Sequence, residues 1–175
     1  MLWVTRNHVH VDRVATPWLI KRFIDHEAQF IFMETDKINE FAEKTGAIPY
    51  DTGTGVELDH HKCDGEKHCT FDAVFEKYDL FNDAALEKVR QVVRAADTGG
   101  ENPYAYGMEV VATGSVLLQD VEDDHDALVK EFPFYDALYA YFKRDFIIEE
   151  HKAEYEALKT RGERLAFVKE KLYAK

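Results

Sequence analysis

The sequence predicts one α/β or α+β domain over residues 1–175, with a small sheet in the N-terminal half and a largely helical C-terminal half. Two observations support this fold class. Runs rich in β-branched and aromatic residues alternate with helical patterns up to residue 50, and after residue 70 apolar residues recur at helical spacing. The chain has no internal repeat and no low-complexity linker, so its 175 residues correspond to one ordinary domain.

The first half of the chain predicts three extended segments and two helices. Thr16 is a good N-cap, and Pro17 suits the first position of a helix, where its missing N–H removes no hydrogen bond. Gly46 ends the second helix. The expected elements are a strand over residues 2–11, a helix over 17–25, a strand over 28–33, a helix over 36–44 and a short extended segment over 47–50.

The second half is predicted to be helical after a polar loop. Residues 51–70 are rich in glycine, histidine and charge, and the one strand expected there covers 56–58. Pro133 is expected to interrupt or kink a helix, and Gly99 follows the end of another. The expected helices cover residues 71–78, 83–96, 104–118, 124–142 and 149–172.

Composition restricts the class of function. A hydrophobic fraction of 46% and a charged fraction of 32% are typical of a globular protein. The net charge of −12, from 34 acidic and 22 basic residues, opposes binding to nucleic acid, which needs a basic patch. The same charge repels a small dianion unless arginine side chains attract it locally.

The sequence also predicts a cytoplasmic protein with no membrane partner. No apolar run is long enough to span a bilayer, and the N-terminus lacks the pattern of a signal peptide. Two cysteines, Cys63 and Cys69, are too few to hold a fold by disulfides.

Metal-ligating residue types occur in four segments, of which the first is His8 to Arg13. In an extended chain His8, His10 and Asp12 share one face, which suits a metal or proton-transfer site. The alternative is a solvated strand face, with Asp12 capping the next helix.

The second segment, residues 55–70, contains three histidines, two cysteines and four carboxylates. Carboxylates with imidazole suit manganese, iron or zinc, whereas thiolates favour zinc. A joint site of Glu57 and His60 requires a bend, because an extended chain places them on opposite faces. Two alternatives stay open: a polar loop that binds nothing, and a zinc site on His61, Cys63, His68 and Cys69.

The third and fourth segments contain Asp97 and His125. Asp97 lies at the negative end of a predicted helix, where a bound cation would compensate it; the alternative is an ion pair with Arg94. His125 lies in the first turn of a helix, which favours the neutral imidazole that binds metal, but this segment alone favours the alternative, an acidic helix start with an incidental histidine. The aromatic segment 132–142 is interpreted as core or as the face of a homodimer.

Several segments together resemble one known family. The motifs extend in order over roughly 140 residues, a match that coincidence does not explain. They are Trp3-Val4-Thr5-Arg6, His10-Val11-Asp12-Arg13, Pro17 to Asp25, Ala47 to Asp51, Gly55-Val56-Glu57 with His60, Cys69-Thr70-Phe71-Asp72, Arg94 to Thr98, Asp124 to Leu128 and Tyr135 to Tyr139. In these motifs the chain resembles the C-terminal domain of the ChrB-type chromate-resistance proteins.

The resemblance implies a role in chromate resistance or response, centred on a small-molecule or metal site. Longer family members resemble chromate-responsive regulators, but this chain begins at the domain itself, so we expect no operator binding. The ligands expected for one iron, manganese or zinc ion are His60, Glu57, Asp97 and His125, with His10 or Asp12 bound directly or one contact away. Arg13 and Arg22 are expected to attract an oxyanion.

The alternative function is an oxyanion sensor without catalysis. In that case the anion binds the arginines and the helical half rearranges. A partner or a second subunit responds to the rearrangement, and the metal is absent or structural. The sequence does not separate an enzyme from a sensor, because no residue is assignable as a nucleophile.

Overall fold

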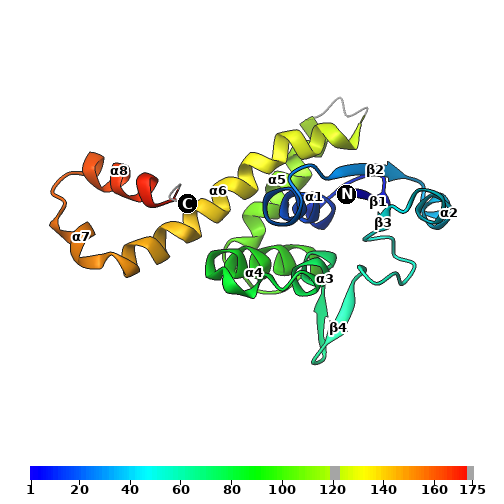
Figure 1. Cartoon of the computed structure of the whole chain (residues 1–175), viewed down its shortest axis with the longest axis horizontal. Helices are drawn as coiled ribbons and strands as arrows, with labels where there is room; N and C mark the ends of the chain where they lie inside the picture. The colour runs from blue at the N-terminus through cyan, green and yellow to red at the C-terminus, as the bar shows by residue number, and fades with distance from the viewer. Residues whose placement is uncertain (119–122, 173–175) are drawn as a thin grey trace.

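A computed structural model describes residues 1–118 and 123–172 (Figure 1). It confirms the predicted fold class: a small sheet near the N-terminus, followed by helices. In chain order the elements are β1 (Leu2–Arg6), α1 (Val11–Leu19), the π-helix η1 (Ile20–Ile24), β2 (Gln29–Met33), α2 (Thr35–Thr45), β3 (Ile48–Pro49), β4 (His61–Cys63), β5 (Glu66–His68), α3 (Thr70–Lys77), the 3-10 helix η2 (Leu80–Asn82), α4 (Ala84–Thr98), α5 (Ala105–Leu118), α6 (Asp124–Glu150), α7 (Lys152–Ala157) and α8 (Arg161–Leu172).

The sheet that organises the N-terminal half has the order β2-β1-β3, with all three strands parallel. Side chains alternate between its faces. Trp3 belongs to the main core together with Trp18 of α1, whereas Val4 packs with Ile38 of α2. Helices α1 and α2 therefore cover opposite faces of the sheet (Figure 1).

The order of the strands predicts where a ligand would bind. The chain builds β2 on one side of β1 and then crosses over to place β3 on the other side. In open parallel sheets, ligands bind at the carboxyl ends of the strands, at the point where the order reverses. Here that point lies between β1 and β3, so the segments that follow these two strands meet at one edge.

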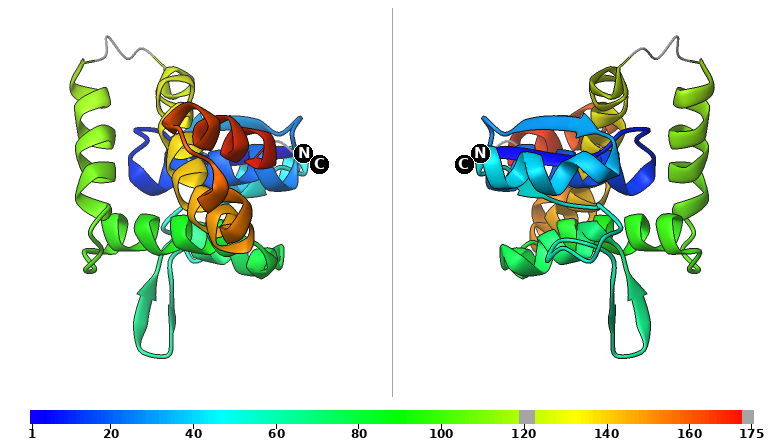
Figure 2. Two further views of the ribbon diagram at one scale, coloured as in Figure 1. Left: turned by 90° about the vertical axis from the view of Figure 1, so that its left-hand side faces the viewer. Right: turned by 90° about the vertical axis from the view of Figure 1, so that its right-hand side faces the viewer.

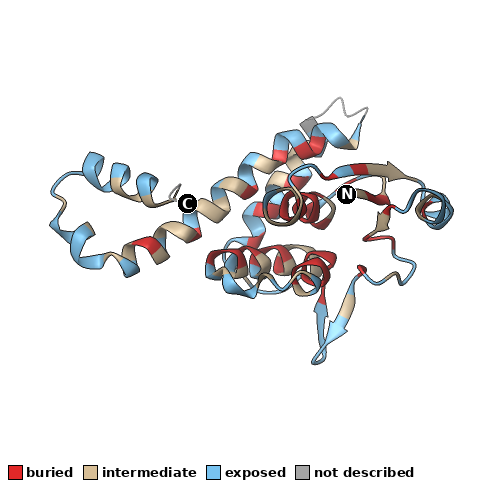
Figure 3. Ribbon diagram, viewed as in Figure 1, coloured by how far each residue is buried: buried red, intermediate tan, exposed pale blue. Residues whose placement is uncertain are grey.

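Helices α4 and α6 of the helical half pack against α1, the helix that follows β1 at this edge. Helix α4 buries Leu86, Val89 and Val92 in the main core, and the Tyr135 hydroxyl of α6 donates to the Val11 carbonyl at 3.1 Å. Buried residues concentrate around α1, α3 and α4 (Figure 3), and α7 and α8 bury none. No helix in the described ranges has the length and apolar character needed to cross a membrane.

The start of α1 differs from the prediction. Strand β1 ends at Arg6, His8 turns the chain with a φ of 61°, and α1 begins at Val11, so the helix expected from Pro17 starts six residues earlier. Pro17 lies inside α1, which continues into the π-helix η1. The expectation that His8, His10 and Asp12 share a strand face is therefore wrong. Long-range contacts such as the bond from Tyr135 to Val11 outweigh the local preference of Pro17.

Two further predictions of secondary structure are wrong. The strand expected over residues 56–58 is only a single bridge between Tyr50 and Leu58, and the strands of this region form the hairpin β4–β5 instead. The expected terminal helix over 149–172 is divided among the end of α6, α7 and α8, while α6 continues through Pro133. Strand β2 and helices α2, α4 and α5 confirm the predictions for those segments.

Candidate metal centre at the edge of the sheet

Asp12, in the first turn of α1, is a buried carboxylate at the edge where β1 and β3 end. Its Oδ2 accepts a hydrogen bond from the Thr70 amide at 2.7 Å, and its Oδ1 accepts from the Phe71 amide at 2.9 Å. The Thr16 hydroxyl also donates to Oδ1 at 3.1 Å. The Asp12 carboxylate therefore joins α1 to the first turn of α3 and satisfies two amides that the helix itself leaves without partners.

Asp51 follows β3 and brings a second buried carboxylate to the same edge. Two arginines hold it: Arg6 Nη2 lies 2.8 Å from Oδ1, and Arg13 Nη1 lies 3.2 Å from Oδ2. Asp51 has a φ of 44°, in the left-handed region that few non-glycine residues adopt. Buried ion pairs that form around a strained backbone are typical of functional sites.

The loop between Asp51 and His60 is folded around a third buried carboxylate, Asp59. Its oxygens accept hydrogen bonds from the backbone amides of Gly53, Gly55 and Val56 and from both the amide and the hydroxyl of Thr52. This network determines where the next residue, His60, enters the site. A cavity of about 320 Å³ opens beside it, lined by Arg6, Asp51, Gly53, Gly55, Asp59 and His60.

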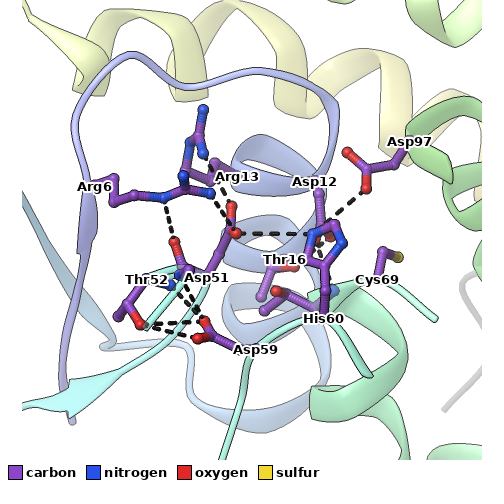
Figure 4. Close-up of polar contacts among 12 residues, drawn as sticks. Arg6, Asp12, Arg13, Thr16, Asp51, Thr52, Asp59, His60, Cys69 and Asp97 are labelled. Atoms are coloured by element: carbon purple, nitrogen blue, oxygen red, sulfur yellow. Dashed lines mark hydrogen bonds and ion pairs between the residues drawn. The ribbon is translucent and has the colours of Figure 1, made fainter. Parts of the chain in front are cut away.

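Asp97 reaches the site from the last turn of α4, as Figure 4 shows. The expected alternative, an ion pair with Arg94, is not formed, because Arg94 pairs with Asp72 at 2.6 Å. Asp97 Oδ2 is buried and accepts no hydrogen bond. A buried oxygen without a hydrogen bond needs a physical explanation, and the binding of a cation would provide one.

His60 lies among these carboxylates (Figure 4). Its Nε2 is 3.2 Å from Asp12 Oδ2, 3.5 Å from Asp97 Oδ2 and 3.7 Å from Asp51 Oδ1. The hydrogen bond to Asp12, opposed by partial burial and helped by the other two carboxylates, raises the pKa of His60 to about 9. Burial, together with the charge of Asp12, raises the pKa of Asp97 to about 7.

These shifts predict a pH dependence of stability in the presence of a chelator. His60 binds its proton more tightly in the folded state, with a pKa of about 9, than in the unfolded state, with a value of 6.5. Because the folded state holds more protons in this interval, the free energy of unfolding falls as the pH rises from 6.5 to 9. Urea denaturation at several pH values measures this slope. His60→Gln should flatten it, and an unchanged slope in that variant would assign the effect to another group.

The structure brings three of the six predicted metal ligands to the same edge of the sheet. Asp12 and His60 form one group of possible ligands with Asp51, and Asp12 and Asp97 form a second group with Cys69. Glu57 is exposed and pairs with Lys77, and the ring of His125 packs against Phe32 at 5.0 Å. Exposed His10 lies 3.4 Å from the Thr113 hydroxyl. Among the described residues, Glu57, His125 and His10 belong to no group of possible ligand atoms within 4.8 Å of one another.

The two predicted anion-binding arginines lie in different places. Arg13 is part of the site through Asp51, and its Nη2 also donates to the His8 carbonyl at 2.7 Å. Arg22 forms a two-point ion pair with Asp136 at 2.8 Å, beside Trp18 on the surface between η1 and α6.

Two residues of the site, Arg6 and Asp51, were missed by the sequence reasoning, and a third, Cys69, was considered only for the alternative zinc site of the loop. The Cys69 sulfur forms a ligand group with Asp12 and Asp97, and burial raises its pKa well above the usual value. Each of the three stands within one of the family motifs quoted above, and that position was the signal that could have identified them.

Comparison with known proteins agrees with the resemblance. A profile of the family described as "ChrB, C-terminal domain" matches residues 3–142. The chain belongs to the ChrB C-terminal domain family. It is 30% identical over 142 residues to "Protein ChrB" of Cupriavidus metallidurans, a match that covers 80% of this chain and 40% of that protein. No solved structure matches the chain.

The matched range of the ChrB C-terminal domain includes Asp12, Asp51, His60 and Asp97 and ends within α6. Helices α7 and α8 lie beyond it. The chain spans about 40% of the length of the curated relative, so the activity of that whole protein does not transfer directly.

Proposed function

We propose that this ChrB C-terminal domain holds one transition-metal ion on His60, Asp12 and Asp97, and uses it to respond to chromate or a related oxyanion. The observation that carries the proposal is the position of His60 Nε2, 3.2 to 3.7 Å from three carboxylates that come from separate segments of the chain. A folded metal site requires ligand atoms from separate segments to lie close together, and these side chains do so.

The spacing of these atoms supports a metal. Nitrogen and oxygen ligands about 2.0–2.1 Å from a tetrahedral ion lie about 3.3 Å from one another. The distances from His60 Nε2 to Asp12 and Asp97, 3.2 and 3.5 Å, are close to that value. A cation would also complement Asp97 Oδ2, which accepts no hydrogen bond and has only the His60 imidazole near it, at 3.5 Å. Imidazole with carboxylates suits iron, manganese or zinc, and the buried Cys69 thiol nearby would favour zinc.

Charge supports a connection between the metal and an oxyanion. With His60 protonated, the three carboxylates are balanced by His60, Arg6 and Arg13. A divalent ion that replaces the His60 proton would make the charge of the site more positive by one unit. In a protein with a net charge of −12, such a local gain of positive charge would favour the approach of a dianion.

Membership in the ChrB family supports a role in chromate resistance or response. We place that role in the cytoplasm, where the free cysteines Cys63 and Cys69 stay reduced. A homodimer remains a proposal, which the mass in solution tests. In the aromatic segment of α6, Tyr135 and Phe142 are buried in the core, whereas Phe134 and Tyr141 are exposed.

Metal analysis tests the proposal. Untagged protein purified without chelator should lose about one equivalent of transition metal per chain when His60 is changed to Ala, because water does not replace an imidazole without a large loss of affinity. His26→Ala is the matched control, since His26 bonds to the Lys21 carbonyl away from the site. Equal metal content in wild type and His60→Ala would contradict the proposal.

A sensor that works without metal is the second candidate function. One observation favours it: the pKa of about 9 keeps His60 protonated at neutral pH, so an imidazolium already occupies the place of a cation. In that case metal analysis finds no difference between wild type and His60→Ala, while oxyanion binding persists in the presence of chelator.

Oxyanion binding should depend on Arg13 more than on Arg22. Arg13→Ala is expected to weaken chromate or sulfate binding about tenfold, and the difference should shrink with added salt. Arg22→Ala should have little effect, because Arg22 pairs with Asp136 between η1 and α6, away from the candidate centre. Isothermal titration measures both. A larger loss in Arg22→Ala would place the anion site beside α6 instead.

A further inference from the structure

A second cluster of metal-ligating side chains lies on the hairpin β4–β5, which projects from the helices (Figure 2). The strands are joined by Asp64 and Gly65, with φ values of 51° and 85°. Positive φ at both positions is typical of the type I′ turn, which fixes the register of a two-residue hairpin. In this register His61 is directly opposite His68. Because side chains alternate along a strand, both imidazoles lie on one face of the hairpin.

That face is turned toward α3, where Glu76 completes the cluster. Glu76 Oε2 is 3.4 Å from His61 Nε2, and Glu76 Oε1 is 3.2 Å from His68 Nδ1. The two imidazole rings are 5.1 Å apart, and one ligand atom from each of the three residues lies within 4.8 Å of the others. His68 is buried, whereas His61 and Glu76 are partly exposed, so an ion can reach them from solvent.

We propose that His61, His68 and Glu76 form a second site for a divalent transition-metal ion such as zinc, which fastens the hairpin to α3. Ligands of a tetrahedral zinc ion lie about 3.3 Å from one another, and both nitrogen-to-oxygen distances in the cluster are close to this value. Two imidazoles and one carboxylate are a common set of three zinc ligands, with water in the fourth position.

Neighbouring contacts hold Glu76 in place for this role. Arg90 Nη1 lies 3.5 Å from Glu76 Oε1 and 3.1 Å from buried Asp72, so a fixed cation orients the carboxylate from behind. Such outer contacts position metal ligands in known sites. Arg90 also neutralises part of the negative charge of Glu76. We therefore expect a lower metal affinity than a site with an unpaired carboxylate would have.

The ligands differ from those of a cysteine-based zinc site on the same loop. Cys69 is buried at the start of α3, and its sulfur belongs to the group formed with Asp12 and Asp97. Cys63 is exposed and belongs to none of the ligand groups found among the described residues. The two histidines of that alternative remain, and Glu76 takes the place of the thiolates.

The second site shares no ligand with the candidate centre, but the two are adjacent in the chain. His60 points toward Asp12, and the next residue, His61, points toward Glu76. An ion that fastens the hairpin would therefore restrict the backbone that positions His60. The inference does not rest on the proposed function, because it stands whether or not His60 binds metal.

Zinc titration of the full, untagged chain by calorimetry tests the inference, with the metal alone as the probe. Glu76→Gln and His68→Asn should each lose one binding event, with affinity reduced more than about 100-fold, and keep any event that depends on His60. Glu66→Gln, on the same face of the hairpin, and Cys63→Ser should bind as wild type does. Wild-type stoichiometry and affinity in both Glu76→Gln and His68→Asn would overturn the inference.

Tryptic cleavage of the hairpin provides a second measurement. Lys62 and Lys67 lie on the face opposite the histidines and are exposed, so trypsin can reach them. Zinc should slow their cleavage in the wild type but not in Glu76→Gln. Equal protection of the two proteins would also overturn the inference. If His60→Ala loses one binding event and keeps the event that depends on His68 and Glu76, the two sites bind metal independently.

Discussion

Asp12→Ala is expected to lower the free energy of unfolding by about 3–5 kcal/mol in the presence of chelator. The carboxylate accepts buried hydrogen bonds from the amides of Thr70 and Phe71 and from the Thr16 hydroxyl. Truncation leaves the two amides without partners, and each buried unsatisfied group costs about 1–3 kcal/mol. It also removes the carboxylate whose hydrogen bond contributes most to the raised pKa of His60.

Urea denaturation with matched variants measures this effect. Asp12→Asn retains an acceptor oxygen and should lose about half as much stability. Asp36→Ala is the matched control, because Asp36 occupies the first turn of α2 but is exposed, and its loss should stay below about 0.5 kcal/mol. A loss below about 1 kcal/mol in Asp12→Ala would show that α3 does not depend on this contact.

Asp97→Asn is expected to act in the opposite direction on stability and strongly on metal binding. At pH 8 the buried carboxylate is ionised at a position that raises its pKa from 3.8 to about 7, mainly because of burial and the charge of Asp12. Removing that charge should stabilise the metal-free protein by about 1–2 kcal/mol, less than the full shift implies, because the amide must be buried too. Metal affinity should fall more than about 100-fold, because the ligand loses its charge.

The opposite signs distinguish a ligand from a structural residue. When a carboxylate that stabilises the fold is neutralised, the protein becomes less stable. When a carboxylate retained for binding is neutralised, the protein becomes more stable. Thermal denaturation with chelator and metal titration give the two values on the same samples. The stabilisation should disappear at pH 5, where the folded wild type already holds the Asp97 proton. Destabilisation at pH 8, or unchanged metal affinity, would contradict the role of Asp97.

Local signals in the sequence were sufficient to predict those helices whose ends are marked by residues of the same segment. Gly46 and Gly99 adopt the left-handed conformation after α2 and α4, as the helix-ending glycines predicted. The Asp64-Gly65 pair was also a readable hairpin signal that the sequence reasoning did not use. The alternation of strands and helices before residue 50 was enough to indicate the fold class.

Only the tertiary structure decided where α1 begins and which side chains meet. Val11 starts the helix because Tyr135, far along the chain, bonds to its carbonyl and because Asp12 is buried against α3. No short-range preference encodes either contact.

The sequence by itself determined the residue types of the candidate centre and three of its members, Asp12, His60 and Asp97. Tertiary structure added Asp51 and Arg6 and placed Glu57 and His125 outside. The physical reason is that the order β2-β1-β3 brings together the segments that follow β1 and β3, which are separated by about forty residues of chain. Spacing along the sequence reports which side chains share a local face, but the order of the strands determines which distant ones share a site.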